Sequence, residues 1–286
     1  AFSVAINPNL RTGGVSAVMQ SGAILMGLAN SARFGFRYLI SAGNQAVLDI
    51  SDYIGYLATD PETKVILAFV EGIPNAEKFV DAVRAAFHAG KPVLMLKVGR
   101  SEGAQRAVQA HTGSLAGSDS VLDAVLQKEG VIRLNSLDEL VQAAELFAVA
   151  PLPKTDGIGL LSLSGGQIGL VEDLSQGMNL NFSKLSDETL AALHEILPSF
   201  STVSNPVDAW GNGDLEKMYP GCVAAVASQS DISLIAMSRD TPLGVADREI
   251  EQSMRIAESA VRVKNEFKKA VLLFSNFSGN FDPKVE

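Results

Sequence analysis

The stretch VILAFVEGIPNAEKFVDAVRAAFHAGKPVLMLKV, residues 65–98, decides the fold class. Its two ends, residues 65–70 and 92–98, are short apolar runs of the kind that form buried strands. Between them, residues 76–89 have the apolar spacing of an amphipathic helix. A strand, a helix and a second strand in this order predict a right-handed crossover between parallel strands of one sheet.

The same alternation continues through the first half of the chain. It predicts strands over residues 15–19, 38–41 and 131–134, and helices over residues 22–34, 51–59, 118–128 and 137–148. Residues 150–157 then interrupt the pattern with two prolines and a glycine among polar residues. This composition is typical of a linker between domains.

After the linker the alternation starts again. It predicts strands over residues 157–163, 232–237 and 270–275, and helices over residues 167–176, 187–197, 215–227 and 246–264. The sequence therefore predicts an α/β protein made of two consecutive doubly wound, parallel-sheet domains, residues 1–150 and 151–286. A length of 286 residues fits two domains.

Composition narrows the classes of partner. A formal net charge of −9 argues against nucleic acid and anionic membranes as general partners, although a local basic pocket for a small anion stays open. The single cysteine, Cys222, excludes an internal disulfide and fits a reducing cytoplasm. No apolar run is long enough to span a membrane. The chain begins without Met and ends abruptly, so we expect a piece of a longer protein.

Two similar turns stand where a predicted strand leads into a predicted helix. One is Gln20-Ser21-Gly22 and the other is Ser164-Gly165-Gly166. A helix N-terminus offers unpaired N–H groups and the positive end of its dipole, and glycine lets an anion approach the backbone. Each turn is therefore a candidate phosphate site, although it could equally serve only to start a helix. Neither turn has the spacing of a P-loop or of a dinucleotide fingerprint.

His111 lies in the segment AHTGSLAGSD, residues 110–119, which is built of small and polar residues. We expect this segment to be a loop outside any helix, in which the imidazole could receive and carry a phosphoryl group. Glu71 follows the apolar run 65–70, at the sheet edge where doubly wound folds bind their ligands. Its carboxylate could accept a hydrogen bond from one imidazole nitrogen and leave the other free to attack. The alternative for residues 110–119 is an ordinary surface loop. The alternative for Glu71 is a charge at the start of the next helix.

Three further residues are candidate phosphate or substrate contacts. Lys97 and Arg100 come at the end of the run 92–98, and either could hold a phosphate oxygen or simply be solvated. Asn44 closes the turn Ser41-Ala42-Gly43-Asn44 after another predicted strand. With one cysteine and scattered histidines, the sequence predicts no metal site.

Taken together, these motifs resemble the NDP-forming acyl-CoA synthetase family and its succinyl-CoA-synthetase-like, flavodoxin-like domains. The resemblance covers nearly the whole chain, and its most specific part is His-Thr-Gly-Ser-Leu-Ala-Gly at residues 111–117. It also rests on the two Ser-Gly turns, on Glu71-Gly72-Ile73, on Lys97-Val98-Gly99-Arg100-Ser101 and on Ser204-Asn205-Pro206-Val207-Asp208.

The resemblance implies a reversible reaction of a carboxylic acid, CoA and ATP that gives acyl-CoA, ADP and phosphate through a phosphohistidine. His111 matches the phosphorylated histidine, and Glu71 matches the carboxylate that orients it. The turns at Ser21-Gly22 and Ser164-Gly165-Gly166 match two helix N-termini that face each other across the phosphate. The histidine loop is implied to swing to a separate ATP-grasp domain, where ADP takes the phosphoryl group.

The resemblance also implies partners. CoA and ATP or ADP with Mg²⁺ are expected to bind mainly on a CoA-binding Rossmann domain and an ATP-grasp domain, which are absent from this chain and belong to the same gene or to a separate subunit. No prosthetic group is expected, the substrate is a small carboxylic acid, and a cytoplasmic homo- or hetero-oligomer is implied. Neither the acid nor the choice between ADP and GDP can be predicted from these residues.

Two other interpretations stay open at this stage. The first is a non-catalytic module of the same fold that senses CoA or acyl-CoA. The second is an unrelated flavodoxin-like protein, which would bind a flavin. The combination of His111, Glu71 and both turns favours the enzyme.

Overall fold

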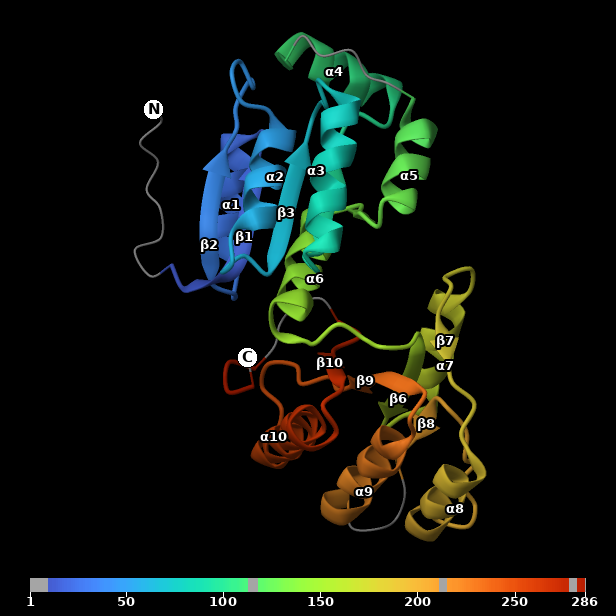
Figure 1. The fold of residues 1–286 in the computed structure, drawn as a ribbon. Helices are drawn as coiled ribbons and strands as arrows, with labels where there is room; N and C mark the ends of the chain where they lie inside the picture. The colour runs from blue at the N-terminus through green and yellow to red at the C-terminus, as the bar shows by residue number, and fades with distance from the viewer. Residues whose placement is uncertain (1–9, 113–117, 211–214, 278–281, 286) are drawn as a thin grey trace. The chain divides into compact units, whose positions relative to one another are not determined.

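The computed structural model describes residues 10–112, 118–210, 215–277 and 282–285. The chain divides into two compact units, Ala1–Val149 and Ala150–Glu286, each built on its own parallel sheet (Figure 1). Residues 113–117 of the predicted histidine loop lie outside the described part of the chain.

The first unit contains five parallel strands in the order β2-β1-β3-β4-β5. All six residues of the central strand β3 are buried, as expected for a strand that is covered on both faces. In the register, Met19 pairs with Phe69 and Val70 pairs with Lys97, so β1, β3 and β4 end at nearly the same level. The strands are β1 (Thr12–Met19), β2 (Phe36–Ser41), β3 (Val65–Val70), β4 (Val93–Lys97) and β5 (Ile132–Leu134).

Helices cover both faces of this sheet. One apolar cluster joins the sheet to α1 (Gly22–Ser31) and α6 (Leu137–Val149). A second cluster joins the opposite face to α2 (Ile50–Thr59), α3 (Ala76–His88) and α5 (Asp119–Lys128). This is the doubly wound arrangement, in which ligands bind beyond the carboxyl ends of the strands.

Short polar residues start these helices. Asp49 forms a capping box at the start of α2, where it accepts hydrogen bonds from Ser51 N and Asp52 N and where Asp52 accepts from Asp49 N. Asn75 caps α3 through a single hydrogen bond, which its Oδ1 accepts from Lys78 N at 3.0 Å. The caps stop each helix from unwinding at the point where the chain leaves the sheet.

The second unit contains the parallel path β10-β9-β6-β7, with β8 as an additional partner of β6. β7 pairs with the start of β6, and β8 pairs with its end, where Ser162 lies opposite Asp208. The strands are β6 (Gly157–Ser162), β7 (Asn181–Phe182), β8 (Val207–Asp208), β9 (Ile232–Ser238) and β10 (Ala270–Phe274).

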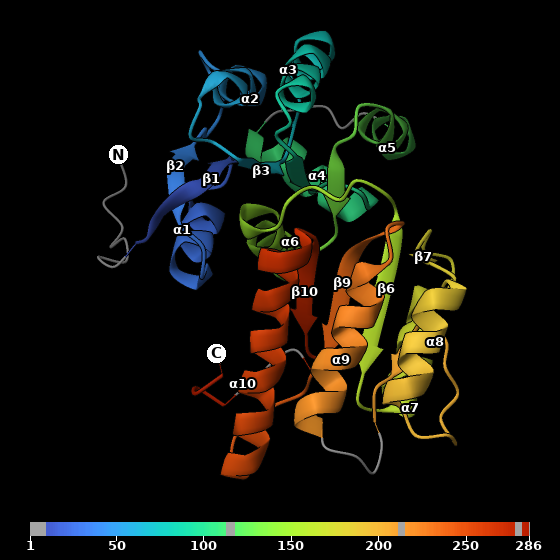
Figure 2. The same cartoon turned by 60° about the horizontal axis from the view of Figure 1, so that its bottom comes forward.

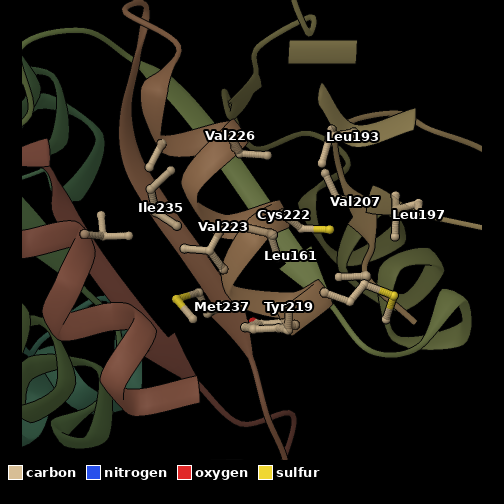
Figure 3. Close-up of a cluster of buried hydrophobic side chains, with 14 of the residues drawn as sticks. Leu161, Leu193, Leu197, Val207, Tyr219, Cys222, Val223, Val226, Ile235 and Met237 are labelled. Carbon is tan, nitrogen blue, oxygen red and sulfur yellow. The ribbon is translucent and has the colours of Figure 1, made fainter. Parts of the chain in front are cut away.

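Three helices, α8 (Asp187–Ile196), α9 (Leu215–Ser228) and α10 (Asp247–Arg262), lie beside this sheet (Figure 2) and share one apolar cluster with it. A π-helical segment, η1 (Val263–Phe267), extends α10. By contrast, no residue of α7 (Gly165–Ser175) is buried. Figure 3 shows the centre of the cluster, which includes Leu193, Tyr219, Cys222, Val226 and Met237.

The predicted fold class is confirmed, because both units are α/β with parallel sheets. One expectation was wrong. The backbone of His111 does not lie in a loop outside any helix, because it belongs to the last turn of α4 (Glu102–Thr112). α4 escaped prediction because Val108 is the only large apolar residue in its sequence, and among the described side chains of residues 102–110 only Val108 is buried. The two-residue strands β7 and β8 were also missed, since they are too short to carry a pattern.

No helix in the described part of the chain is both long and apolar enough to cross a membrane.

Candidate functional site

The candidate site of the first unit lies at the carboxyl edge of its sheet. In the order β2-β1-β3-β4-β5, the winding direction reverses between β1 and β3, which is where folds of this type hold their ligands. Gln20 follows β1, Glu71 follows β3, and Lys97 ends β4. Because these three strands end at nearly the same level, their polar residues meet at one edge.

Gln20 is buried and holds the peptide that follows β3. Its Oε1 accepts hydrogen bonds from Glu71 N at 2.5 Å and from Gly72 N at 3.0 Å. Its Nε2 donates to Gly72 O at 2.7 Å. Both polar atoms of the Gln20 side chain therefore hold the backbone at residues 71–72.

Lys97 holds the other side of the same peptide. Its Nζ donates to Glu71 O at 2.9 Å and also to Val98 O. Burial lowers the pKa of Lys97, because removal from water disfavours the ammonium, while the carboxylates of Asp119 and Glu71 act in the opposite direction. Glu71 thus has its N–H held from β1 and its carbonyl held from β4.

Ser21 and Gly22 form the turn between β1 and α1. Ser21 is the N-cap, and its Oγ accepts a hydrogen bond from Ile24 N at 3.4 Å. A Cβ on Gly22 would lie 3.5 Å from Ser41 Oγ, an ordinary contact distance, so packing alone does not demand glycine there. The first turn of α1 contains no acidic residue that would compete with an anion.

Arg100 and Asn44 have other surroundings than the residues that hold Glu71. Arg100 Nη1 donates to Asn135 Oδ1 at 2.6 Å, and Arg100 Nε lies 4.0 Å from Asp119 Oδ2. Its guanidinium is therefore already tied to α5 and to the turn before α6. Asn44 is exposed in the turn after β2.

Gln45 is a residue that the sequence analysis did not single out. Its backbone has a φ of +56°. Its Oε1 accepts a hydrogen bond from Ile50 N at 2.6 Å, and its Nε2 lies 3.5 Å from Gly72 O. Gln45 therefore ties the start of α2 to the turn after β3. An amide directly after the Gly43-Asn44 turn was the only signal available in the sequence.

His111 lies at the end of α4, the helix that follows β4 in the chain. Ser101 starts this helix, because its Oγ accepts from Ala104 N at 3.2 Å and its carbonyl accepts from Gln105 N at 2.8 Å. The backbone of His111 then falls in the last turn of α4, directly before residues 113–117. The role of its imidazole stays a prediction.

In the second unit, the carboxyl edge of the sheet carries the other Ser-Gly turn. Ser164 is the N-cap of α7, and its Oγ accepts from Gln167 N at 3.4 Å. Gln167 also donates to Asp240 Oδ2 at 2.6 Å and accepts from Ser162 Oγ at 2.8 Å. The first turn of α7 is therefore fixed to β6 and to the residues that follow β9.

Asp208 lies beside this turn. A Cβ on Gly165 would lie 3.1 Å from Asp208 Oδ2, closer than most real contacts, so the carboxylate leaves little room for a side chain there. Gly166 is more open: in the described part of the chain, and leaving aside the backbone of α7 itself, its Cβ position has Ser164 Oγ at 3.7 Å as its one neighbour within 4 Å.

Among the residues that the structure describes, no cluster of three His, Cys, Asp or Glu side chains could hold a metal ion. Cys222 is buried in the core, and burial raises the pKa of its thiol to about 12.

Comparison of the chain with known proteins shows the family to which it is similar. The model of the succinyl-CoA ligase like flavodoxin domain matches residues 12–147. The α subunit of the ADP-forming acetate–CoA ligase II of Pyrococcus furiosus is 35% identical over 212 residues, which cover 73% of this chain and 46% of the relative. A trans-feruloyl-CoA synthase from an unknown prokaryotic organism is 33% identical over 235 residues, which cover 81% of this chain and 33% of the relative.

A solved structure shares the fold. It is an acetyl-coenzyme A synthetase 1 of Ca. Korarchaeum cryptofilum in complex with phosphate and ADP, with a TM-score of 0.82 at 24% identity, covering 97% of this chain and 59% of that chain. The chain thus spans about half the length of the first curated relative.

The fold and the polar residues at its sheet edges define an α/β protein with flavodoxin-like domains. The chain belongs to the NDP-forming acyl-CoA synthetase family.

Proposed function

We propose that this chain is part of an ADP-forming acid–CoA ligase that works through a phosphohistidine. In the forward direction, ATP phosphorylates an imidazole nitrogen, and the phosphoryl group passes to the carboxylate of the acid. The thiol of CoA then attacks the acyl carbon and releases phosphate. The ADP-forming ligases among the relatives support this reaction class, and the different acids in their names leave the acid open.

The observation that carries the proposal is the fixed position of Glu71 at the sheet edge. Gln20 holds its N–H and Lys97 holds its carbonyl, so its backbone is fixed on both sides. A carboxylate mounted in this way suits a group that must orient an imidazole during phosphoryl transfer. We assign this task to Glu71 and the transfer itself to His111.

The two Ser-Gly turns have the second role. The N–H groups at the start of α1, beside Ser21 and Gly22, would bind phosphoryl oxygens in the first unit, and those at the start of α7, beside Gly165 and Gly166, would do so in the second unit. A dianionic group needs several such donors, because each N–H neutralises only part of its charge.

CoA and ATP or ADP with Mg²⁺ enter as substrates, and we expect them to bind mainly on a CoA-binding domain and an ATP-grasp domain outside this chain. Those domains belong either to a longer form of the protein or to a partner subunit. A cytoplasmic oligomer is part of the same proposal.

Phosphate labelling tests the function directly. The intact protein, combined with its CoA-binding and ATP-grasp segments, is incubated with ATP labelled at the γ-phosphate. We expect an acid-labile, base-stable label that is lost in His111→Asn and retained in His194→Asn, which alters an exposed histidine of α8. A folded wild-type protein that takes no label from ATP, or from acyl-CoA and phosphate, would instead support the non-catalytic sensing module.

The role of Glu71 has its own test. Glu71→Gln should slow labelling by about 10²–10⁴-fold, the range for loss of a group that assists proton or phosphoryl transfer. Glu77→Gln, at an exposed position of α3, removes the same charge and should leave the rate unchanged. Equal rates for the two variants would remove Glu71 from the mechanism.

A further inference from the structure

Asp119, the first residue of α5, has no task in the proposed function. Its carboxylate lies between two arginines. Oδ1 accepts a hydrogen bond from Arg133 Nη2 at 2.5 Å, and Oδ2 lies 4.0 Å from Arg100 Nε. The side chain of Arg133 is 8% exposed, and its Nη1 also donates to Asp123 Oδ1 at 3.0 Å. One buried guanidinium therefore holds two carboxylates of α5, which lie one helical turn apart.

The register of the sheet explains why Arg133 meets α5. Arg133 of β5 lies opposite Met95 of β4, so the two side chains project to the same face of the sheet. Met95 belongs to the apolar cluster that joins this face to α2, α3 and α5. Lys97 comes two residues after Met95 in β4, so it projects to that face as well. Arg133 and Lys97 therefore lie on the side of the sheet that α5 covers.

The charge of Asp119 also acts on Lys97, whose Nζ donates to Glu71 O at 2.9 Å. Burial lowers the pKa of Lys97, and the neighbouring Arg133 lowers it as well, whereas Asp119 and, to a smaller extent, Glu71 raise it. Asp119 thus opposes the effect of burial more than Glu71 does. A charged lysine is a stronger hydrogen-bond donor than a neutral one, so the carboxylate of Asp119 supports the hydrogen bond that holds Glu71.

Asp119 also stands at one end of the part of the chain that carries His111. Arg100 comes directly before Ser101, which starts α4, and the backbone of His111 lies in the last turn of that helix. Asp119 then starts the next helix, α5. The 4.0 Å approach of Arg100 Nε to Asp119 Oδ2 therefore brings the two ends of residues 101–118 together at one carboxylate.

We propose that Asp119 is a positioning residue for the phosphoryl transfer that we assign to His111 and Glu71. Its carboxylate fixes the start of the helix that follows His111, and its charge supports the lysine that holds Glu71. Asp123 pairs with the same arginine, but it lies one turn further along α5 and is 64% exposed, so its task is only to tie α5 to β5. This inference rests on the proposed function and adds a residue that brings its two reacting groups into place.

The first test compares Asp119→Asn with the matched control Asp123→Asn in the intact protein, combined with its CoA-binding and ATP-grasp segments. Asparagine keeps the size and one acceptor of aspartate but removes its charge. We expect labelling by ATP to be slower in Asp119→Asn by up to about 10²-fold, the effect of misplacing reacting groups by about 1 Å. Labelling should be unchanged in Asp123→Asn, although that variant also removes a carboxylate partner of Arg133. Asp119→Glu, which retains the charge, should recover part of the lost rate.

The titration of Lys97 gives a second readout, which a merely structural role of Asp119 would not move. Carbon-13 NMR of labelled lysine side chains follows it, and the signal of Lys97 is identified by its absence from Lys97→Met. The charges that act on Lys97 are Asp119 from α5, Arg133 from β5 and Glu71 after β3. The pKa of Lys97 should fall further in Asp119→Asn, because a carboxylate that favours the ammonium is lost, and should keep its wild-type value in Asp123→Asn.

The outcomes separate this inference from the proposed function. Equal labelling rates in Asp119→Asn and Asp123→Asn, or an unchanged pKa of Lys97 in Asp119→Asn, would overturn the role of Asp119 and leave the phosphohistidine in place. A folded wild-type protein that takes no label would overturn the proposed function and this inference with it.

Discussion

Gln20 and Glu71 are joined across the sheet edge through the main chain of Glu71. The Oε1 atom of Gln20 accepts from Glu71 N at 2.5 Å and from Gly72 N at 3.0 Å, and its Nε2 atom donates to Gly72 O at 2.7 Å. A side-chain amide suits this arrangement, because its oxygen accepts two hydrogen bonds while its nitrogen donates one. Gln20 is therefore a positioning residue for Glu71, although the sequence had suggested a phosphate contact for it.

Gln20→Ala should reduce stability and phosphoryl transfer together. It leaves two N–H groups without their acceptor at a buried place, which costs about 1–3 kcal/mol. Urea unfolding measures the loss of stability, and labelling of His111 measures the loss of transfer. Gln127→Ala removes an exposed amide from α5 and should change neither quantity. A fully stable Gln20→Ala protein with normal labelling would show that the hydrogen bonds to residues 71–72 do not matter.

Lys97 should make stability depend on pH at the alkaline end. Burial lowers the pKa of Lys97 below its usual 10.5, so the unfolded chain binds more protons between the lowered value and 10.5. The contribution of Lys97 to stability is therefore smallest at neutral pH and rises as the pH increases toward 10.5. The unfolding free energy of the wild type minus that of Lys97→Met should therefore become more positive as the pH rises over that interval, as measured in urea titrations. A constant difference would contradict the effect of burial.

Two glycines of α7 should respond oppositely to the same substitution. Gly165→Ala places a Cβ 3.1 Å from Asp208 Oδ2 and should weaken phosphate binding, because the carboxylate has to move. The methyl group of Gly169→Ala meets no described atom within 4 Å apart from the backbone of α7 itself, and the change should stabilise the second unit by about 0.5–1 kcal/mol, because alanine favours the helix. Phosphate titration and urea unfolding distinguish the two effects. Similar phosphate affinities in both variants would show that a Cβ at residue 165 does not disturb Asp208 or the phosphate site.

Two leucines provide a test of the core of the second unit. Leu193 of α8 is fully buried, and Leu193→Ala should cost about 2–5 kcal/mol of unfolding free energy. Leu174 of α7 is 64% exposed, so Leu174→Ala should change stability by no more than about 0.5 kcal/mol. A large loss in Leu174→Ala would mean that α7 is covered in the protein in solution.

Cys222 should be inert toward thiol reagents in the native protein. It is buried, and burial raises the pKa of its thiol to about 12, so the thiolate is nearly absent at neutral pH. Reaction with a chromogenic disulfide should become visible only after denaturant is added. Rapid native reaction would show that α9 opens locally.

Strongly patterned elements could be predicted from the sequence. The fully apolar strand β3 and the capped, amphipathic helices α2 and α3 carry their own signals, and all three were expected close to where they lie. α4 could not be predicted in the same way, because Val108 is the only large apolar residue in residues 102–112 and small alanines give a weak signal. For β7 and β8, pairing with β6 rather than local composition defines the strand.

For the candidate site, the sequence indicated which residues gather at the sheet edge but not what each side chain holds. Glu71 and the two turns were expected beside parallel strand ends, and they lie there. Gln20 was expected to contact phosphate and Lys97 was a candidate for such a contact, whereas the side-chain hydrogen bonds that the structure gives them go to the backbone at residues 71, 72 and 98. Such partners depend on the register of distant strands, which no local pattern encodes.

The hydrogen bonds of Gln20 also constrain how this domain can be recombined. Gln20 is adjacent to Ser21, the N-cap of α1, so the segment that starts α1 and the segment that carries Glu71 are tied as one piece. A chimera that takes residues 12–41 from one relative and residues 65–74 from another would need matching geometry on both sides of that tie. Exchange of segments between relatives, made to obtain new acyl specificities, should therefore give folded proteins more often when both segments come from the same relative.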